Sequence, residues 1–328
     1  MFMIITKTPY RISFFGGGSD YPEWFNKNQG EVISTTINKF IYISCRFLPH
    51  FFRHKYRVVY SKIENVKNYN QIKHNAVKQI LKYYNFNDGL EIHYDGDLPA
   101  RSGMGSSSCF VVGLLHALMK LKNKKINSNI LSTKSIFLER NLMHENVGLQ
   151  DQIAASYGGF NSIKFSKTNF RVSKINCSNK FKATLNKNLF LVYTGISRTA
   201  QKIANSYTNK LSYNKRENIK NILKIVERAK KTIKQNNCDD FGRLLHETWV
   251  EKRSLSTSVT TNKIDSLYDK GLKNGALGGK LLGAGGGGFI LFYVENKKIP
   301  NFKRAFSSNI LVPVNLSDKG SEVIFYEK

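Results

Sequence analysis

The stretch that most constrains this chain is DLPARSGMGSSSC, residues 97–109. An alternating apolar run that ends at Tyr94 precedes it, and an apolar run at helical spacing, residues 109–121, follows it. This order predicts a strand, a loop and a helix. Gly103 and Gly105 leave backbone N–H groups open to a ligand, and the serines after them supply caps and hydroxyls at the positive end of the helix dipole. The stretch predicts a polyphosphate site; a glycine turn before a Ser-capped helix is the alternative.

Two further glycine-rich stretches lie at residues 14–24 (FFGGGSDYPEW) and 275–288. Three consecutive glycines suit a backbone that approaches a ligand closely, although a bulge and turn would also use them. The later stretch carries an entropic cost that a purely structural loop would not need, so we expect something to move or dock there. Lys280 is followed by leucine, and Ser108 stands where a third glycine would be needed, so the Walker A and dinucleotide motifs are both excluded.

Length and composition limit the class of protein. The chain has 328 residues, 41% of them apolar, which favours two domains with a large core. No apolar run is long enough to span a bilayer. The N-terminus predicts a first strand rather than a signal peptide, so a cytoplasmic protein without membrane contact is expected. The four cysteines are far apart with no C-x-x-C pair, which argues against zinc.

The formal net charge of +28 raises the question of a nucleic-acid partner. The lysines, however, are scattered among asparagines along the whole chain, and no basic cluster is interleaved with aromatic residues. This pattern favours a solvated basic surface that attracts phosphorylated small molecules, and it argues against nucleic acid.

The pattern of elements predicts an α+β protein. Residues 1–60 contain four strand-like runs, residues 72–84 a helix, and residues 160–175 a hairpin. Asp151 falls at the start of a short helix over 150–156, where its charge is favourable; an ordinary N-cap aspartate is the alternative.

The second half alternates strands and helices and closes with a strand at residues 322–326, which predicts a ferredoxin-like layer. Polar residues dilute the pattern before a fresh strand at 189–193, so we expect a domain boundary near residue 185. The predicted domains are residues 1–185 and 186–328.

Three motifs in this order resemble those of the GHMP kinases: Pro9-x-Arg11 with GGGSDY at 16–21, LPxxxGMGSSS at 98–108, and GAGGGG at 283–288. The resemblance covers about residues 4–327. Within the family, TPYRISFFGGGSDYPEWF, GLQDQIAASYGGF and LVYTGISRTA are similar to heptose 7-phosphate kinases. Galactokinases carry Gly-Glu-His-x-Asp-Tyr where this chain has GGGSDY, so they are disfavoured.

The resemblance implies a two-domain fold, with a ribosomal-protein-S5-domain-2-like N-terminal domain that binds ATP and a ferredoxin-like C-terminal domain. It also implies ATP- and Mg²⁺-dependent phosphorylation of the anomeric hydroxyl of D-glycero-D-manno-heptose 7-phosphate. The 1,7-bisphosphate would then serve nucleotide-activated heptose and surface polysaccharide synthesis. A small-molecule sugar phosphate is the expected partner, and a homodimer is left open.

The resemblance also implies roles for individual residues. Asp151 would be the base and Arg11 its cationic neighbour. Ser107 and Glu139 would hold Mg²⁺, with Glu145 as the alternative to Glu139. The nucleotide-binding residues would be Ser102, Gly103, Met104, Gly105, Ser106, Ser107 and Ser108. The substrate-binding residues would be Gly17, Gly18, Ser19, Asp20, Arg198, Lys280, Gly285 and Gly286.

Three other readings remain open from the sequence. One is a related sugar-1-kinase, for instance a fucokinase. Another is a catalytically silent sugar- or nucleotide-binding relative, which the presence of Arg11, Ser107 and Asp151 argues against. The third is an RNA-binding protein, which steep salt-dependent RNA binding without kinase activity would favour.

Overall fold

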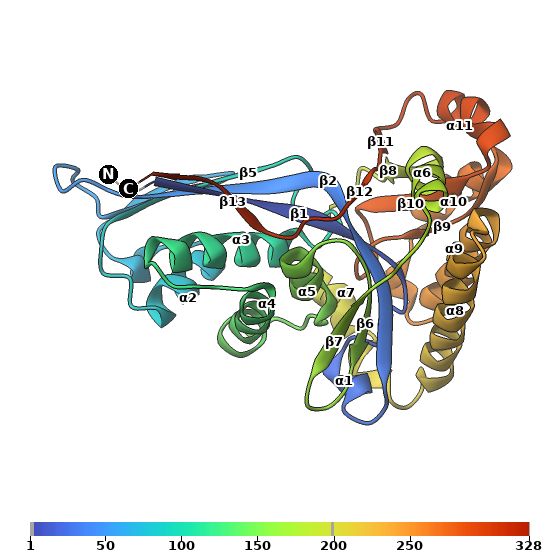
Figure 1. Ribbon diagram of the computed structural model, residues 1–328, viewed down its shortest axis with the longest axis horizontal. Helices are drawn as coiled ribbons and strands as arrows, with labels where there is room; N and C mark the ends of the chain where they lie inside the picture. Colours follow the sequence, from blue (N-terminus) through green and yellow to red (C-terminus); the bar gives the residue numbers. More distant parts are fainter. Residues whose placement is uncertain (1–2, 198–199, 328) are drawn as a thin grey trace.

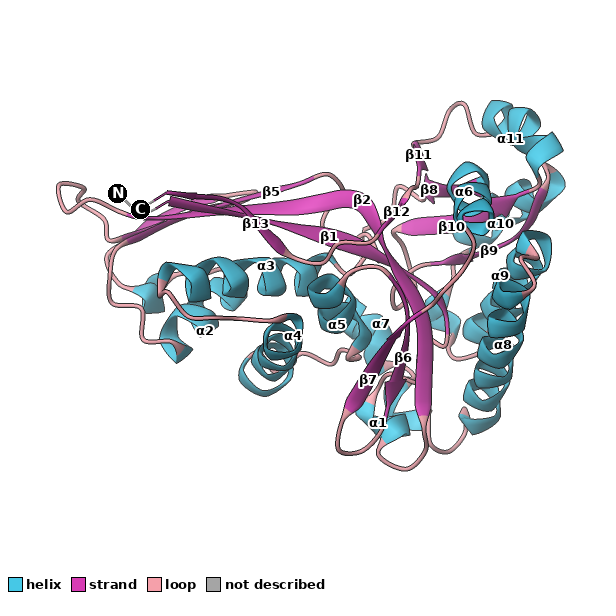
Figure 2. Cartoon of the chain, viewed as in Figure 1, coloured by secondary structure: helices cyan, strands magenta, loops and turns pink. Residues whose placement is uncertain are grey.

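The computed structural model describes residues 3–197 and 200–327, and two sheets organise it (Figures 1 and 2). The larger sheet has the order β13-β1-β2-β5-β3-β4, with β12 and β6 also paired to β2, and β7 paired to β6. Its strands are β1 (Met3–Phe15), β2 (Gly30–Phe47), β3 (Tyr56–Val59), β4 (Ile63–Val66), β5 (Leu90–Gly96), β6 (Phe160–Phe165), β7 (Phe170–Lys174), β12 (Leu316–Ser317) and β13 (Glu322–Glu327). The smaller sheet is antiparallel, in the order β11-β8-β10-β9. Its strands are β8 (Leu189–Tyr193), β9 (Ala276–Leu281), β10 (Phe289–Val294) and β11 (Leu311–Pro313).

Two long strands replace the four short ones predicted for residues 1–60. β1 and β2 pair almost end to end, and the residues expected to separate the short strands pair as well, for instance Thr8 with Ile41 and Pro9 with Phe40. The pairing shifts between Pro9 and Arg11, where a proline lacks the N–H that a regular ladder needs. The prediction of separate strands was wrong because a strand can continue through a proline at a shift in the pairing, so Pro9 does not end the strand.

Helices cover the larger sheet on one face (Figure 1). They are α2 (Asn75–Tyr83), α3 (Ser106–Leu121), α4 (Ser128–Phe137) and α5 (Gln150–Tyr157). The apolar run of α3 is buried almost all round, as expected for a central helix. A π-helical turn, Leu138–Leu142, continues α4 directly.

The remaining helices, apart from α1 (Pro22–Phe25), lie between residue 179 and residue 305: α6 (Asn179–Asn188), α7 (Ala200–Asn205), α8 (Arg216–Lys234), α9 (Cys238–Arg253), α10 (Asn262–Lys273) and α11 (Ile299–Ala305). The sequence did not predict β9, whose glycines suggested a loop. A Cβ at Gly278 would lie 2.2 Å from the carbonyl oxygen of Gly242 in α9. Glycine therefore allows α9 to pack directly on this strand.

The chain crosses between the two sheets more than once. Helix α6 runs across the predicted boundary at residue 185, and the last strands, β12 and β13, return to pair with β2 and β1. The division at residue 185 stays a prediction. Among the helices of the described residues, none has the length and hydropathy to cross a bilayer.

Candidate active site

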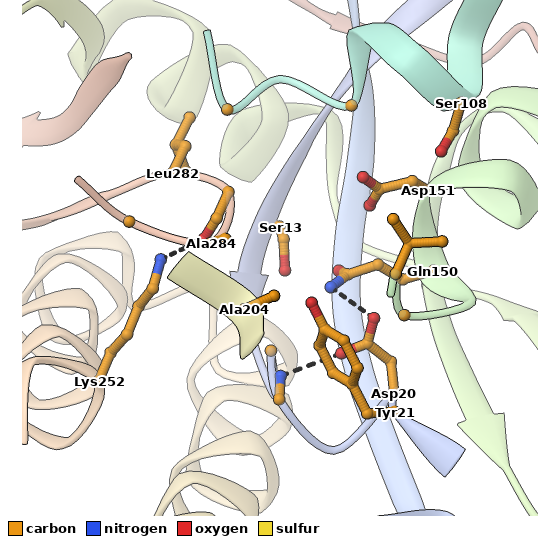
Figure 3. A pocket seen from close by; sticks show the side chains of 18 of the residues that line it. Ser13, Asp20, Tyr21, Ser108, Gln150, Asp151, Ala204, Lys252, Leu282 and Ala284 are labelled. Carbon is orange, nitrogen blue, oxygen red and sulfur yellow. Dashed lines mark hydrogen bonds between the residues drawn. The ribbon is translucent and has the colours of Figure 1, made fainter. Parts of the chain in front are cut away.

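A cavity lies where elements of both sheets meet, and all three glycine-rich stretches line it (Figure 3). From the larger sheet and its helices come Arg11 and Ser13 of β1 and the start of α3. From the other side come Lys252 of α9 and Lys280 of β9. Segments that are far apart in the sequence therefore form one site.

An ion pair between Arg11 and Asp151 lies at the centre of this site. Nε of Arg11 lies 2.7 Å from Oδ1 of Asp151, and Nη2 lies 2.7 Å from Oδ2, so the contact is bidentate. Arg11 is buried, whereas the side chain of Asp151 keeps 23% of its surface exposed toward the cavity. Asp151 stands in the first turn of α5 but does not cap it; the N-cap is Leu149. Arg11 therefore orients a carboxylate that a ligand can reach.

The loop before α3 packs directly against this pair. Nη1 of Arg11 donates to the carbonyl oxygen of Gly103 at 2.8 Å. A Cβ on Gly105, which has φ +75°, would lie 3.3 Å from both Oδ2 of Asp151 and Cγ of Arg11. Gly105 is the N-cap of α3, and no side chain caps that helix. The serines thus lie in the first turn rather than at the cap, and the helix keeps its N-terminal N–H groups for a ligand.

The third glycine stretch docks on this loop. A Cβ on Gly283 would lie 2.6 Å from Cα of Gly103, and one on Gly288 would lie 2.2 Å from the carbonyl oxygen of Ser102. The N–H of Phe289 donates to that same oxygen at 3.1 Å. Glycine is required here because the two backbones touch, which accounts for the dense run that had suggested docking or movement.

Asp20 lies on the opposite wall from this loop. Its carboxylate accepts hydrogen bonds from the N–H of Gly18 at 3.0 Å and from Nε2 of Gln150 at 2.9 Å (Figure 3). Its pKa is raised to about 6, first by burial and then by the charge of Asp151. A Cβ on Gly148 would lie only 2.0 Å from Oδ2 of Asp20, so the loop before α5 closes over this carboxylate.

A buried carboxylate, Glu139, lies against the first turn of α3. Glu139 is fully buried, and its Oε2 accepts hydrogen bonds from Oγ of Ser108 at 2.8 Å and from Nε2 of Gln152. Its Oε1 has no partner among the described residues. The pKa of Glu139 is raised to about 8 by burial and by the charge of Glu145, which lines the cavity. An orphaned carboxylate oxygen near hydroxyls and a second carboxylate fits a hard divalent cation.

Most of the predicted site residues line the cavity. They are Arg11, Gly17, Gly18, Asp20, Gly103, Gly105, Ser106, Ser107, Ser108, Glu145, Asp151, Lys280 and Gly285. Arg198 lies outside the described residues.

Five predicted residues are not part of the cavity wall: Ser19, Ser102, Met104, Glu139 and Gly286. The hydroxyl of Ser19 is bound to the carbonyl oxygen of Gly16, so it fixes the turn instead of facing a ligand. Met104 is buried in the core. The N–H of Gly286 is bound to the carbonyl oxygen of Val259. The contacts of Ser102 and Glu139 described above likewise support the wall from behind. Glu139 bonds to Ser108, and the expectation that Ser107 and Glu139 hold Mg²⁺ stays a prediction.

Sequence reasoning missed several residues of the cavity, above all Lys252 and Gln150. Gln150 adjoins Asp151, so its position offered a weak signal. Lys252 is one of 51 Lys and Arg residues, and no motif surrounds it. Two aromatic residues, Tyr21 and Tyr207, also line the cavity, and burial raises the pKa of each hydroxyl.

Two family models match this chain. The GHMP kinases N terminal domain matches residues 70–159, and the GHMP kinases C terminal domain matches residues 229–310, together more than half of the chain. These ranges contain the loop before α3, Asp151 and the glycine stretch before β10.

Relatives and solved structures agree with these matches. The D-glycero-alpha-D-manno-heptose 7-phosphate kinase of Campylobacter jejuni is 27% identical over 92% of both chains. The bifunctional fucokinase/GDP-fucose pyrophosphorylase of Arabidopsis thaliana is 25% identical over 88% of this chain and 29% of that relative. The crystal structure of a D-glycero-D-manno-heptose 1-phosphate kinase from Bacteroides thetaiotaomicron superposes with a TM-score of 0.80 at 21% identity, covering 99% of this chain and 100% of that one.

A two-domain fold with a glycine loop at a helix N-terminus, facing a carboxylate held by arginine, fits a phosphotransferase. The chain belongs to the GHMP kinases and is an ATP-dependent phosphotransferase with an alcohol group as acceptor.

Proposed function

We propose that this enzyme is a sugar kinase that transfers the γ-phosphate of ATP to the anomeric hydroxyl of D-glycero-D-manno-heptose 7-phosphate. The observation that carries the proposal is the position of Asp151. Its carboxylate lies next to Gly105 of the phosphate loop on one side, and its charge acts on Asp20 on the other. The match to the Campylobacter jejuni heptose 7-phosphate kinase along 92% of both chains supports the choice of acceptor.

On this proposal, the first turn of α3 and its glycine loop hold the β- and γ-phosphates through backbone N–H groups. Phosphoryl transfer passes through a loose transition state, so positioning and charge neutralisation matter more than covalent help. Arg11 contributes a buried positive charge beside the loop, because its Nη1 already binds the carbonyl oxygen of Gly103.

Asp151 acts as the base that accepts the proton of the acceptor hydroxyl. Its bidentate contact with Arg11 fixes the orientation of the carboxylate. An anomeric hydroxyl is more acidic than a simple alcohol. General-base catalysis by Asp151 therefore needs to accelerate the transfer by no more than the usual factor of about 10²–10⁴.

The sugar substrate contacts Asp20, whose carboxylate accepts hydrogen bonds from sugar hydroxyl groups. Two hydrogen bonds, from Gly18 and Gln150, fix its orientation. The glycines at positions 17 and 18 leave room for the sugar against the backbone.

Mg²⁺ would be held by Glu139 or Glu145 together with a hydroxyl of Ser107 or Ser108. The ion would supply charge neutralisation for the transferred phosphoryl group. The orphaned Oε1 of Glu139 is the feature that supports this assignment.

A coupled ADP-release assay tests the proposal. The panel contains heptose 7-phosphate, heptose 1-phosphate, free heptose, fucose and galactose, each with ATP and Mg²⁺. We expect the highest kcat/KM for heptose 7-phosphate. A higher value for fucose would favour the related sugar-1-kinase instead, a choice that the match to the Arabidopsis thaliana fucokinase keeps open. ATP turnover on none of the sugars would contradict the proposal.

A further inference from the structure

Two lysine side chains are buried in the wall of the active-site cavity. Lys252, in the last turn of α9, is 9% exposed, and Lys280 of β9 is 3% exposed. Both line the cavity. Lysine is almost never buried to this extent without a carboxylate partner, because removing the ammonium group from water is costly.

Neither lysine has such a partner within the part of the chain that the structure describes. Nζ of Lys252 donates to the carbonyl oxygen of Leu281 at 2.8 Å and to that of Gly283. Nζ of Lys280 donates to the carbonyl oxygen of Phe14 at 2.9 Å. An ammonium group has three N–H donors. At least one donor of Lys252 and two of Lys280 therefore remain for a ligand.

The charges around the cavity do not balance. Among the described charged side chains that line the cavity, four are cationic (Arg11, Arg101, Lys252 and Lys280) and three are carboxylates (Asp20, Glu145 and Asp151). Asp151 neutralises Arg11 through the bidentate contact, and Asp20 is the carboxylate whose charge acts on both lysines. Burial lowers the pKa of Lys280 to about 7, and it lowers the pKa of Lys252 well below the ordinary value of a lysine. An anion bound between them would remove this imbalance.

Lys252 lies away from the carboxylate of Asp151. In Figure 3, Lys252 and Asp151 are on opposite sides of the cavity, with Ser13 between them. Lys280 lies close enough to Lys252 for its charge to act on it, and the charge of Asp20 acts on both lysines. The pair is thus placed for the far end of an acceptor whose reacting hydroxyl faces Asp151.

We infer that Lys252 and Lys280 bind the phosphate group that the acceptor already carries, so that the enzyme selects a phosphorylated sugar over the free sugar. This inference rests on the proposed function for the position of the reacting hydroxyl. A phosphate monoester carries about −1.5 to −2 charges near neutral pH, and this charge would favour the protonated, cationic form of both lysines. The carbonyl oxygens that hold both lysines pre-orient them without cancelling their charge.

The test compares Lys252→Met and Lys280→Met with the wild-type enzyme. Methionine keeps an unbranched side chain of similar length without the charge. The kinetic arm measures KM and kcat for heptose 7-phosphate and for free heptose, and KM for ATP. We expect each variant to raise KM for heptose 7-phosphate by about 10–100-fold, which is the loss expected for a charged hydrogen bond. KM for free heptose and for ATP should change by less than about threefold.

A matched control comes from Lys215. Its Nζ also donates to a backbone carbonyl oxygen, that of Ser254 at 2.6 Å, but it does not line the cavity. Lys215→Met should leave all three KM values unchanged. A rise in KM for ATP alone would assign the lysines to the nucleotide and overturn the inference. Unchanged constants in a folded Lys252→Met variant would also overturn it.

A binding arm separates this inference from the proposed function. The donor loop is first filled with a non-hydrolysable ATP analogue and Mg²⁺, and inorganic phosphate is then titrated by calorimetry. The wild-type enzyme should bind phosphate, and both methionine variants should lose most of that binding, whichever sugar proves to be the substrate. Equal binding by the wild-type enzyme and both variants would refute the lysine site, even if heptose 7-phosphate is the acceptor.

Discussion

The two sides of the cavity are built in different ways. We call residues 102–108 with the docked stretch 283–288 the donor side, and residues 17–20 with Lys252 and Lys280 the acceptor side. The donor side consists mostly of backbone: glycines in close contact and an uncapped helix N-terminus. The acceptor side consists of buried charged side chains from β1, β9, α9 and the loop after β1.

On the proposed function, the difference follows from what each side would bind. A polyphosphate is recognised by N–H groups and a helix dipole, which any sequence with the right glycines can supply. A sugar phosphate needs side chains of defined charge and shape, and these must come from several elements. Changes on the donor side should therefore act on ATP, and changes on the acceptor side should act on sugar selection.

The largest effect is expected at Asp151, which lies between the two sides. Asp151→Asn should lower kcat by about 10²–10⁴-fold, because the amide cannot accept the proton of the acceptor hydroxyl. The Kd for ATP, measured by calorimetry, should stay near the wild-type value. Asp318→Asn, in an exposed ion pair with Lys182, is the control and should be silent. Near-wild-type turnover of Asp151→Asn would remove this residue from the mechanism.

Gly105 tests the donor side. Gly105→Ala places a methyl group against Asp151 and Arg11 and should lower kcat/KM for ATP by about 10–100-fold, because a displacement of about 1 Å at the reacting groups is costly. Gly195→Ala is the matched control, since Gly195 also has a left-handed φ, +70°, but its Cβ would meet only Nζ of Lys263 within 4 Å. Both variants should lose similar thermal stability. Equal losses of activity would show that backbone strain, and not contact with the pair, is responsible.

Asp20 tests the acceptor side. Asp20→Asn should lower kcat/KM for the sugar by about tenfold through the loss of a charged hydrogen bond, with KM for ATP unchanged. Because the pKa of Asp20 is raised to about 6, its carboxylate gains a proton as the pH falls through 6. The wild-type kcat/KM for the sugar should therefore fall below pH 6, and the Asn variant should lack this acid limb. Asp265 pairs with Arg253 away from the cavity wall, so the control variant Asp265→Asn should still lose kcat/KM below pH 6.

The smallest effect concerns stability. The pKa of Lys280 is about 7 in the folded protein against 10.5 for an ordinary lysine. The unfolded chain binds more protons between these values, so the penalty for burying the charge is complete below pH 7 and disappears as the pH rises toward 10.5. Lys280→Met should therefore raise Tm by about 2–4 °C at pH 6 in the absence of ligand.

The gain in Tm of Lys280→Met should be smaller at pH 8 than at pH 6, and smaller again at pH 9. Lys215→Met serves as the control in the same thermal scans. A gain in Tm that is independent of pH would mean that better packing, and not the buried charge, stabilises the variant.

Several features were accessible from sequence because neighbouring residues carry them. The loop before α3 and the helix after it follow from glycines, serines and an apolar run within about 25 residues. The hairpin of β6 and β7 and the helix that begins at Gln150 were also predicted within a residue of their observed bounds. Strand β9 was missed because its glycines suggested a loop, whereas they allow α9 to pack on the strand.

The residues of the site also fall into those that the sequence indicated and those that only the structure revealed. The sequence by itself singled out the three glycine stretches and, through the family resemblance, Arg11 and Asp151, all of which line the cavity; their roles in catalysis stay predictions. Only the tertiary structure decided that Glu139 bonds to Ser108, that Gln150 holds Asp20, and that Lys252 reaches the cavity. The physical reason is that backbone N–H groups bind anions within one local segment. A buried side chain acquires its function from partners that the fold brings from distant parts of the chain.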